Sequence, residues 1–309
     1  MSNYVEKSLI TQYLKILQMG ETIQLLISGV AQGMIYAMVA FGYNITFSTS
    51  KTFNFSHGEF LMLGGVFGYS IYMTRHLPFV AAILAVILVG IVGGFVLFKT
   101  AIEPSLKVPG YTWVLTTLAF GIITKSAVQV FWSTDDFRFD SPFGNAPLRF
   151  GEVGVLPQEI LIIIVALLIV VAVESFKRYT IFGKAIVAVS EDKNTASLMG
   201  INQQFVILFS FLLSASITGV AGIMVAPITF VGATMGTVLG IKAYAVSIIG
   251  GLESGFGVLL GGLIIGLSEA LTARYVSTGY KDVPGFLILI LVLLFLPNGI
   301  FGKQTIKKV

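Results

Sequence analysis

The chain of 309 residues contains no cysteine and only two histidines, His57 and His76. Without cysteine it can form neither a disulfide nor a thiolate metal site, and two histidines do not make a His cluster for a metal ion. We therefore expect no metal site, no cofactor and no redox chemistry.

Motifs of catalysis are also missing. There is no Gly-x-x-x-x-Gly-Lys-Ser/Thr loop, so any nucleotide hydrolysis that accompanies the function has to come from another chain. No Ser/His/Asp or two-carboxylate arrangement is recognisable from the spacing. The sequence predicts a protein that is not an enzyme and has no catalytic residues.

Charge is scarce: 11% of the residues are charged and 56% are hydrophobic, and the mean hydropathy is +0.92. So few charged residues cannot cover the surface of a water-soluble protein of this length. Lipid must therefore solvate much of the surface. The net charge of +4 does not indicate a nucleic-acid partner, because the basic residues lie at the ends of apolar runs. The chain is predicted to be a multi-pass protein of the lipid bilayer.

Glycine, in contrast, is abundant, with 34 residues, several of them inside apolar runs, such as Gly90, Gly93 and Gly94. Small residues inside membrane helices let two helix backbones approach closely. We expect these glycines to serve helix packing.

Nine apolar runs are candidate membrane elements, at residues 23–47, 58–73, 78–98, 112–132, 159–176, 205–226, 239–252, 256–273 and 285–296. A spanning helix needs about 20 such residues, so 239–252 and 285–296 are too short to cross alone. Short or interrupted segments are typical of the broken helices of transporters. The fold prediction is an all-α, polytopic membrane helix bundle of about 8–10 elements, including short or broken helices, and it leaves room for an inverted repeat.

Basic residues predict the orientation of the chain in the membrane. Lys99 and Lys107, the tract 177–204 and the tail 303–309 are rich in lysine and arginine and are expected in the cytoplasm. The acidic, proline-containing loop 133–158 then lies outside. Residues 21–302 form a single transmembrane domain, and one crossing per run places the N-terminus outside.

An N-terminal segment, residues 1–20, precedes the first run. Its apolar residues recur at spacings of three and four, and it lacks the basic start and cleavage site of a secretory signal. This pattern predicts an amphipathic helix that lies on the membrane or, as an alternative, docks on protein.

The polar tract 177–204 separates two strong apolar runs. A polar start at 190–194 followed by Ala196, Leu198 and Met199 predicts a short helix with these three residues on one side, and Gly200 supplies its C-terminal stop. A cytoplasmic helix pair with one apolar side needs a partner to dock on. The candidate docking residues are Gly183, Lys184, Glu191, Asp192, Ala196 and Gly200.

A second polar tract, 54–60, follows the first run and is predicted to lie at a break between membrane elements, where protein or water has to shield its backbone. The candidate path or gate residues are Asn44, Asn54, His57 and Glu59. Glu59 falls in the first turn of the next helix, near the positive end of the helix dipole. Packing and helix capping are the alternative roles of all four.

Three further charges fall inside apolar runs. Lys125 and Glu269 have comparable membrane depth and predict, as an alternative function, an ion or proton relay of a secondary transporter or channel. Lys242 is expected at an external helix end, from which its amine reaches the membrane surface.

Several blocks together resemble a known family. They are Gly33-Met34-Ile35-Tyr36-Ala37, Asn54-Phe55-Ser56-His57-Gly58-Glu59-Phe60, Gly240-Ile241-Lys242-Ala243-Tyr244 and Pro297-Asn298-Gly299-Ile300-Phe301-Gly302. In order and spacing over roughly residues 20–302 they are similar to the H-type permease of the ATP-binding-cassette importers for branched-chain amino acids. Ser56 replaces the usual Ala, and the basic residue frequent near Val187 is absent.

The resemblance implies an assembly. The tract 177–204 would be the loop that couples the permease to an ATPase, and the expected partners are a second permease subunit, in a hetero- or homodimer, two cytoplasmic ATPase subunits and an external substrate-binding protein. It implies a bacterial or archaeal inner membrane and, as solutes, branched-chain amino acids or related small amino acids and amides. The binding protein would select among them.

Overall fold

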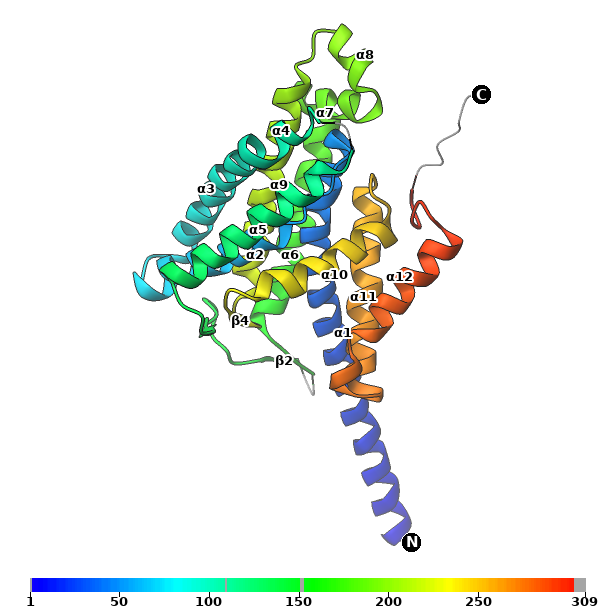
Figure 1. Ribbon diagram of the computed structural model, residues 1–309. Coiled ribbons are helices and arrows are strands. Elements are labelled where there is room, and N and C mark those ends of the chain that lie inside the picture. The colour runs from blue at the N-terminus through cyan, green and yellow to red at the C-terminus, as the bar shows by residue number, and fades with distance from the viewer. Residues whose placement is uncertain (1, 109, 151–152, 303–309) are drawn as a thin grey trace.

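The computed structural model describes residues 2–108, 110–150 and 153–302, which form a bundle of helices (Figure 1). The helices before the long loop are α1 (Ser2–Ser50), α2 (His57–Tyr69), η1 (Ser70–Thr74), α3 (Phe79–Leu97), η2 (Phe98–Ile102), α4 (Glu103–Ser105) and α5 (Thr112–Phe131). The later helices are α6 (Pro157–Tyr179), α7 (Ile181–Glu191), α8 (Lys193–Leu198), α9 (Gln203–Val225), α10 (Met235–Gly250), α11 (Gly255–Tyr275), η3 (Thr278–Tyr280) and α12 (Val283–Phe295).

All nine apolar runs are helical, which confirms the predicted polytopic helix bundle. Within the described residues, seven helices are long and apolar enough to cross a membrane. The runs at 58–73 and 239–252 correspond to α2 and α10, which have 13 and 16 residues and lie inside the bundle. Of the two runs predicted to be too short to cross, 239–252 is the short helix α10, which is largely buried, whereas 285–296 is α12, which together with η3 forms one of the seven candidate spans.

Four short strands were not predicted. β1 (Phe137–Arg138) pairs antiparallel with β4 (Phe230–Val231), and β2 (Leu148–Phe150) pairs antiparallel with β3 (Val153–Val155). The β1–β4 pairing holds the long loop after α5 against the segment between α9 and α10.

The bundle has two distinct ends, which we call the α8 end and the β4 end after the elements that they carry (Figure 1). Successive membrane elements alternate in direction between them. The basic regions around α4 and α7–α8 share the α8 end, and the acidic loop lies at the β4 end, as the orientation prediction requires. The assignment of the two ends to cytoplasm and exterior stays a prediction, and the basic tail 303–309 lies outside the described residues.

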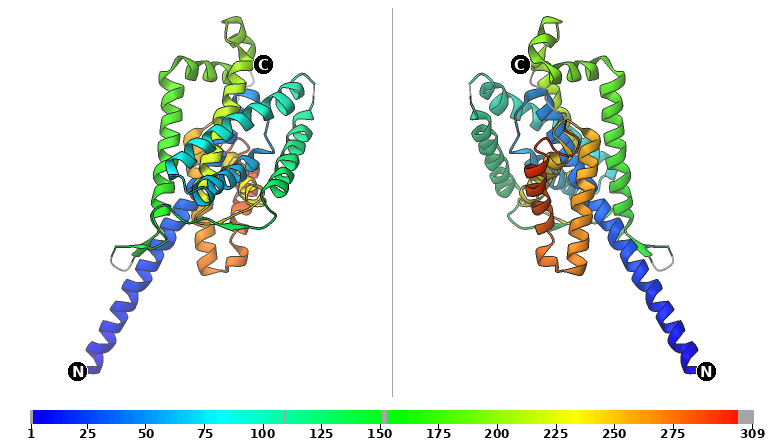
Figure 2. Two further views of the ribbon diagram at one scale, coloured as in Figure 1. Left: turned by 90° about the vertical axis from the view of Figure 1, so that its left-hand side faces the viewer. Right: turned by 90° about the vertical axis from the view of Figure 1, so that its right-hand side faces the viewer.

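The N-terminal segment is helical, as a straight beginning of α1 that projects beyond the bundle at the β4 end (Figure 2). Figure 2 shows no bend between this segment and the first span. Its location on the membrane surface stays a prediction.

Glycine sets the closest helix crossings. A Cβ atom on Gly33 of α1 would lie 2.4 Å from the carbonyl oxygen of Gly262 on α11, and a Cβ on Gly262 would lie 2.4 Å from the carbonyl oxygen of Gly33. Gly90 of α3 faces α9 in the same way, with 2.6 Å to the Cα of Ser216. These contacts confirm that the glycines serve packing, since a larger residue would force the backbones apart.

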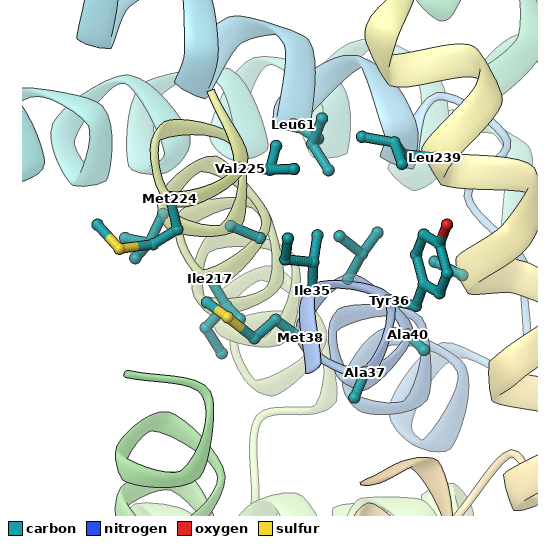
Figure 3. Close-up of a cluster of buried hydrophobic side chains, with 14 of the residues drawn as sticks. Ile35, Tyr36, Ala37, Met38, Ala40, Leu61, Ile217, Met224, Val225 and Leu239 are labelled. Carbon is teal, nitrogen blue, oxygen red and sulfur yellow. The ribbon is translucent and has the colours of Figure 1, made fainter. Parts of the chain in front are cut away.

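The core lies where α1, α2, α9 and α10 meet. Ile35 of α1, Leu61 of α2, Val225 of α9 and Leu239 of α10 point toward one another in Figure 3, and all four are buried. Polar groups of the same helices are therefore held at fixed positions by a packed apolar centre.

Two segments have a similar construction. α1, α2 and α3 form a long, short and long series, as do α9, α10 and α11, and α1 packs on α11 as α9 packs on α3. The short helices cross at Gly58 and Gly236, while α1 and α9 run in opposite directions. This arrangement favours the inverted repeat, which stays a prediction.

Candidate functional site

The tract 51–56 is the break between α1 and α2. Lys51 has a φ of 59°, in the left-handed region, and ends α1. Asn54 then closes a local turn, because its Oδ1 accepts from the backbone N–H of Ser56 at 3.1 Å and from the Ser56 hydroxyl at 2.6 Å. Asn54 and Ser56 are buried, whereas Phe55 is 41% exposed. The predicted break is present, and its backbone is covered by protein.

Asn44 and His57 join neighbouring elements at this level. Asn44 Nδ2 donates to the carbonyl of Gly251, directly after α10, at 3.1 Å. His57 Nε2 lies 3.1 Å from the carbonyl oxygen of Val39 and 2.7 Å from the hydroxyl of Thr218 on α9. Both side chains are buried, so their contacts fit the packing role and also fix the walls of any adjoining path.

Glu59 has a different environment. It lies in the first turn of α2, as predicted, and 9% of it is exposed. Its Oε1 is 3.5 Å from the hydroxyl of Thr237 on α10, it interacts electrostatically with Lys125 on α5, and its Oε2 has no hydrogen-bond partner in the part of the chain that the structure describes. A buried polar atom without a partner is uncommon and marks a functional or hydrated position.

The predicted pairing of Lys125 with Glu269 is wrong. Glu269 Oε1 forms an ion pair with Lys242 at 2.9 Å, and its Oε2 accepts from the Tyr36 hydroxyl at 2.8 Å. Lys242 is 7% exposed and also contacts Asp282 at 2.6 Å, so the expectation that it reaches the membrane surface is wrong too. Membrane depth alone could not predict the partner of Glu269, because Lys125 on α5 and Glu269 on α11 lie on different sides of α10.

This second cluster of Lys242, Glu269, Asp282 and Tyr36 was not predicted from the sequence. Its signal was present as a lysine inside one apolar run and a glutamate inside another, which cannot both stay unpaired in a membrane. Which pair forms depends on how α1, α10 and α11 pack.

The polar tract 177–204 forms the helix pair α7–α8 at the α8 end. Thr180 caps α7 by accepting from the N–H of Gly183 at 2.9 Å. A Cβ on Gly183 would lie 2.0 Å from the Phe176 carbonyl oxygen, so glycine lets α7 turn directly off the end of α6. Ile186, Val189 and Ala196 are buried in a small apolar cluster with Val206 of α9.

Asp192 connects the two helices of the pair. Its carboxylate caps α8 by accepting from the N–H groups of Asn194 at 2.8 Å and Thr195 at 3.2 Å and from the Thr195 hydroxyl at 2.8 Å. The hydrogen bonds from Thr195 and Asn194 lower the pKa of Asp192.

α8 ends as predicted at Gly200, which has a φ of 83°. The N–H of Gly200 donates to the carbonyl of Ser197 and that of Ile201 to the carbonyl of Ala196, which is the Schellman arrangement. The predicted common face is wrong, because Ala196 points into the bundle while Leu198 and Met199 are 88% and 80% exposed. Two residues apart on a helix face nearly opposite directions.

The outward surface of the helix pair is apolar. Its large exposed side chains are Ile181, Phe182, Leu198 and Met199. Of the remaining predicted docking residues, Lys184 and Glu191 are also exposed. We call these six residues the α7–α8 surface.

The helix pair touches the break directly. Lys193 Nζ donates to the carbonyl of Ser50, the last residue of α1, at 2.6 Å. Burial and the charge of Lys51 lower the pKa of Lys193. A cation at a helix C-terminus binds the free carbonyls and the negative end of the dipole, so this contact ties α8 to the start of the tract 51–56.

These features define a class. Short helices inside a bundle of spanning helices, a partly unsatisfied carboxylate beside a helix break, and an exposed apolar helix pair at one end are the construction of a polytopic membrane transport protein.

Comparison with known proteins gives the family. Residues 25–296 match the family described as branched-chain amino acid transport system / permease component. The chain is 31% identical over 300 residues to the high-affinity branched-chain amino acid transport system permease protein LivH of Escherichia coli (strain K12), over 93% of this chain and 97% of that relative. It is 30% identical over 303 residues to the permease protein BraD of Pseudomonas aeruginosa, over 93% and 98%.

A solved structure, PsaBC from Streptococcus pneumoniae in complex with Fab, has a similar fold, with a TM-score of 0.51 and 12% identity over 94% of this chain and 97% of that one. The chain thus belongs to the permease component family of branched-chain amino acid transport systems. It is a multi-pass membrane permease and not itself a catalyst.

Proposed function

We propose that this permease translocates branched-chain amino acids, or related small amino acids and amides, as one subunit of an ATP-driven importer. Its partners are a second permease subunit, two cytoplasmic ATPase subunits and an external binding protein that delivers the solute. The family and the names of its relatives support the solute class.

The proposal rests on the position of the Glu59 carboxylate between the three helices α2, α5 and α10. α2 supplies the carboxylate, α10 supplies Thr237, and α5 supplies Lys125. α5 packs on the rest of the bundle mainly through α2, η2 and α4, and only Thr117, Gly121 and Val128 of its residues are buried. An exposed helix that carries a half-buried lysine opposite an incompletely bonded carboxylate fits the wall of a polar path that a second subunit completes.

The α7–α8 surface is the proposed ATPase contact. It has large exposed apolar side chains at the end predicted to be cytoplasmic, and its two helices are held in place by the buried Ile186, Val189 and Ala196. A contiguous exposed apolar patch on a firm support marks a protein interaction site. Closure of the two ATPases would then move the helix pair and open the path alternately to the two sides.

Single-cysteine variants test both parts, because the chain has no cysteine of its own. Leu198→Cys is expected to cross-link to an ATPase subunit in the assembled complex, whereas Leu148→Cys, an exposed leucine of β2 at the opposite end, is not. Leucine uptake into proteoliposomes should require the ATPases and the binding protein. Uptake at full rate without ATPases would overturn the proposal.

A further inference from the structure

A cavity of about 540 Å³ lies on the other side of α10 from Glu59. Lys242 lines it, and Lys242 and Thr237 are five residues apart, which places them about 140° apart around the helix. α1, α10 and α11 form its walls, and Asp136, Phe230 and Asp282 lie along its lining from the segments at the β4 end. The cavity therefore belongs to one protomer and is separate from the Glu59 side.

The cavity contains a charge network of one lysine and two carboxylates. Lys242 Nζ binds Glu269 Oε1 at 2.9 Å and Asp282 Oδ1 at 2.6 Å, and it also donates to the Tyr36 hydroxyl at 3.1 Å. The side chains of Lys242 and Glu269 are 9% and 7% exposed, but that of Asp282 is 45% exposed. The pair with Glu269 is thus fixed inside, and the pair with Asp282 is accessible.

The rest of the lining is mainly apolar. Leu25, Val238, Leu239 and Ala273 lie among the residues that surround the charge network, and one further charge of each sign, Asp136 and Lys281, also lines the cavity. Apolar walls with a few polar groups that point to one place are the usual construction of a small-molecule site.

We propose that this cavity binds an apolar amino acid as a zwitterion, by insertion between Lys242 and Asp282. The carboxylate of the solute binds the Lys242 amine, its ammonium group binds the Asp282 carboxylate, and its side chain lies against the apolar wall. The single ion pair between Lys242 and Asp282 is thus replaced by two, one from each residue to the solute, and no net charge enters the cavity. Glu269 and Tyr36 keep Lys242 in position.

The charge pattern selects for solutes that carry both charges. A solute without the carboxylate leaves the Lys242 amine with Glu269 alone, and a solute without the ammonium group separates Asp282 from Lys242 without supplying another cation. Either solute forms only one of the two new ion pairs and brings a net charge into the cavity, which is unfavourable. The cavity opens at the end predicted to be external. It is therefore a site that the solute meets on the permease itself, in addition to the external binding protein.

The identity of the solute rests on the proposed function, but the test measures binding and needs no transport. The purified complex of permease and ATPase subunits, without binding protein, is titrated with radiolabelled L-leucine. L-leucine is expected to bind, whereas leucinamide, which lacks the carboxylate, and 4-methylpentanoate, which lacks the ammonium group, should not compete.

Three variants locate the site. Asp282→Asn should weaken leucine binding about tenfold or more, which corresponds to ~1.4 kcal/mol. Ala273→Phe fills the cavity without touching the charges and should abolish binding even if Asp282→Asn folds poorly. Asp140→Asn is the matched control, because Asp140 is an exposed aspartate at the same end whose ion-pair partner is Arg138, and its binding should equal that of the native chain.

Each contrary result is informative. No leucine binding to the native complex, unchanged binding by both Asp282→Asn and Ala273→Phe, or equal competition by either single-charge analogue would overturn the proposed site. Leucine uptake by the complete importer without binding to the permease would reject this site alone, whereas binding without ATP-dependent uptake would reject the proposed function.

Discussion

Glu59 differs from His57 and Asn54 in its hydrogen bonds, whereas Asn44, like Glu59, has a buried oxygen without a partner among the described residues. His57 has two partners and Asn54 closes its own turn, while Glu59 has one distant hydroxyl, one lysine charge and a carboxylate oxygen without a partner among the described residues. The first two residues hold the structure together. Glu59 has bonding capacity left for water or a passing solute.

Replacing Glu59 by Gln should leave expression and ATPase docking intact and slow leucine uptake about tenfold. A tenfold slower rate corresponds to an activation barrier that is ~1.4 kcal/mol higher. Glu59→Leu should also reduce the yield of folded protein, since Thr237 and Lys125 lose a polar partner. Glu103→Gln, in an exposed pair at the α8 end, is the control. If cysteines placed from Asn54 to Phe60 are all unreactive to water-soluble thiol reagents in every transport state, the tract is core packing.

Asp192 gives a pH prediction. Its pKa is lower in the folded chain than in the unfolded chain, so its capping of α8 is complete above the ordinary value of about 3.9 and is lost as the pH falls through the lower folded value. Hydrogen exchange of the Asn194 and Thr195 amides should accelerate in that acidic range. In Asp192→Asn, which can still cap but does not titrate, the acceleration should be absent; the same acceleration there would contradict the prediction.

Helix pairs in this bundle meet through glycines whose missing side chains leave room for a facing carbonyl. α1 and α11 use Gly29, Gly33, Gly262 and Gly266. This close crossing brings Tyr36 of α1 within 2.8 Å of Glu269 on α11. The glycine contacts thus decide where the polar side chains meet.

Gly33→Ala should destabilise the fold by about 1–3 kcal/mol, the usual cost of overpacking, because the added Cβ would lie 2.4 Å from the Gly262 carbonyl oxygen. The thermal midpoint and the yield of the purified subunit are the measurements. Gly279→Ala is the control, since the nearest atom to its Cβ would be 3.8 Å away. Equal stability of both variants would show that α1 and α11 can separate without loss.

Gly200 decides how α8 ends. With a φ of 83°, a β-branched residue there costs about 1–2 kcal/mol, so Gly200→Val should shift the α7–α8 surface. We expect ATP hydrolysis to continue in proteoliposomes while uptake falls. Gly200→Asn, which tolerates this conformation, should keep most of the coupling, and normal coupling in Gly200→Val vesicles would refute the prediction.

The molecule as a whole places its two polar clusters on opposite faces of α10 and its exposed helix pair at one end. Lys193 connects the helix pair to Ser50 at the end of α1. The residue after Ser50, Lys51, forms an ion pair with Glu253 in the connection between α10 and α11. We therefore expect movement of α7–α8 to displace the tract 51–56, which directly precedes the helix that carries Glu59. Spatial continuity becomes coupling only if its removal changes function.

Lys193→Met should uncouple ATP hydrolysis from uptake, because α8 loses its bond to the last carbonyl of α1 while its own helix remains capped by Asp192. The ratio of leucine transported to ATP hydrolysed is the measurement. Lys107→Met, an exposed lysine at the same end, is the control. An unchanged ratio in Lys193→Met would remove this contact from the mechanism.

The sequence by itself determined the solvent, the location of the membrane elements, a break near Asn54 and the helix stop at Gly200, although the break covers 51–56 and residues 57–60 of the predicted tract belong to α2. Each depends on local chemistry, such as apolar run length, or a glycine where the left-handed region is needed. For the same reason, the first-turn position of Glu59 and the short helix α10 could be predicted.

Only the tertiary structure decided which charges meet. Lys125 and Glu269 were predicted at similar depth, yet the packing of α1 on α11 and of α10 beside them gives Glu269 an ion pair with Lys242. Lys125 instead acts on Glu59 through its charge, without an ion pair between them among the described residues. Likewise, helix geometry separates Ala196 from Leu198, but only the packing of α8 on α9 decides that Ala196 is the residue that faces inward. Contacts between residues far apart in the chain depend on helix rotation and crossing, which run length and composition do not specify.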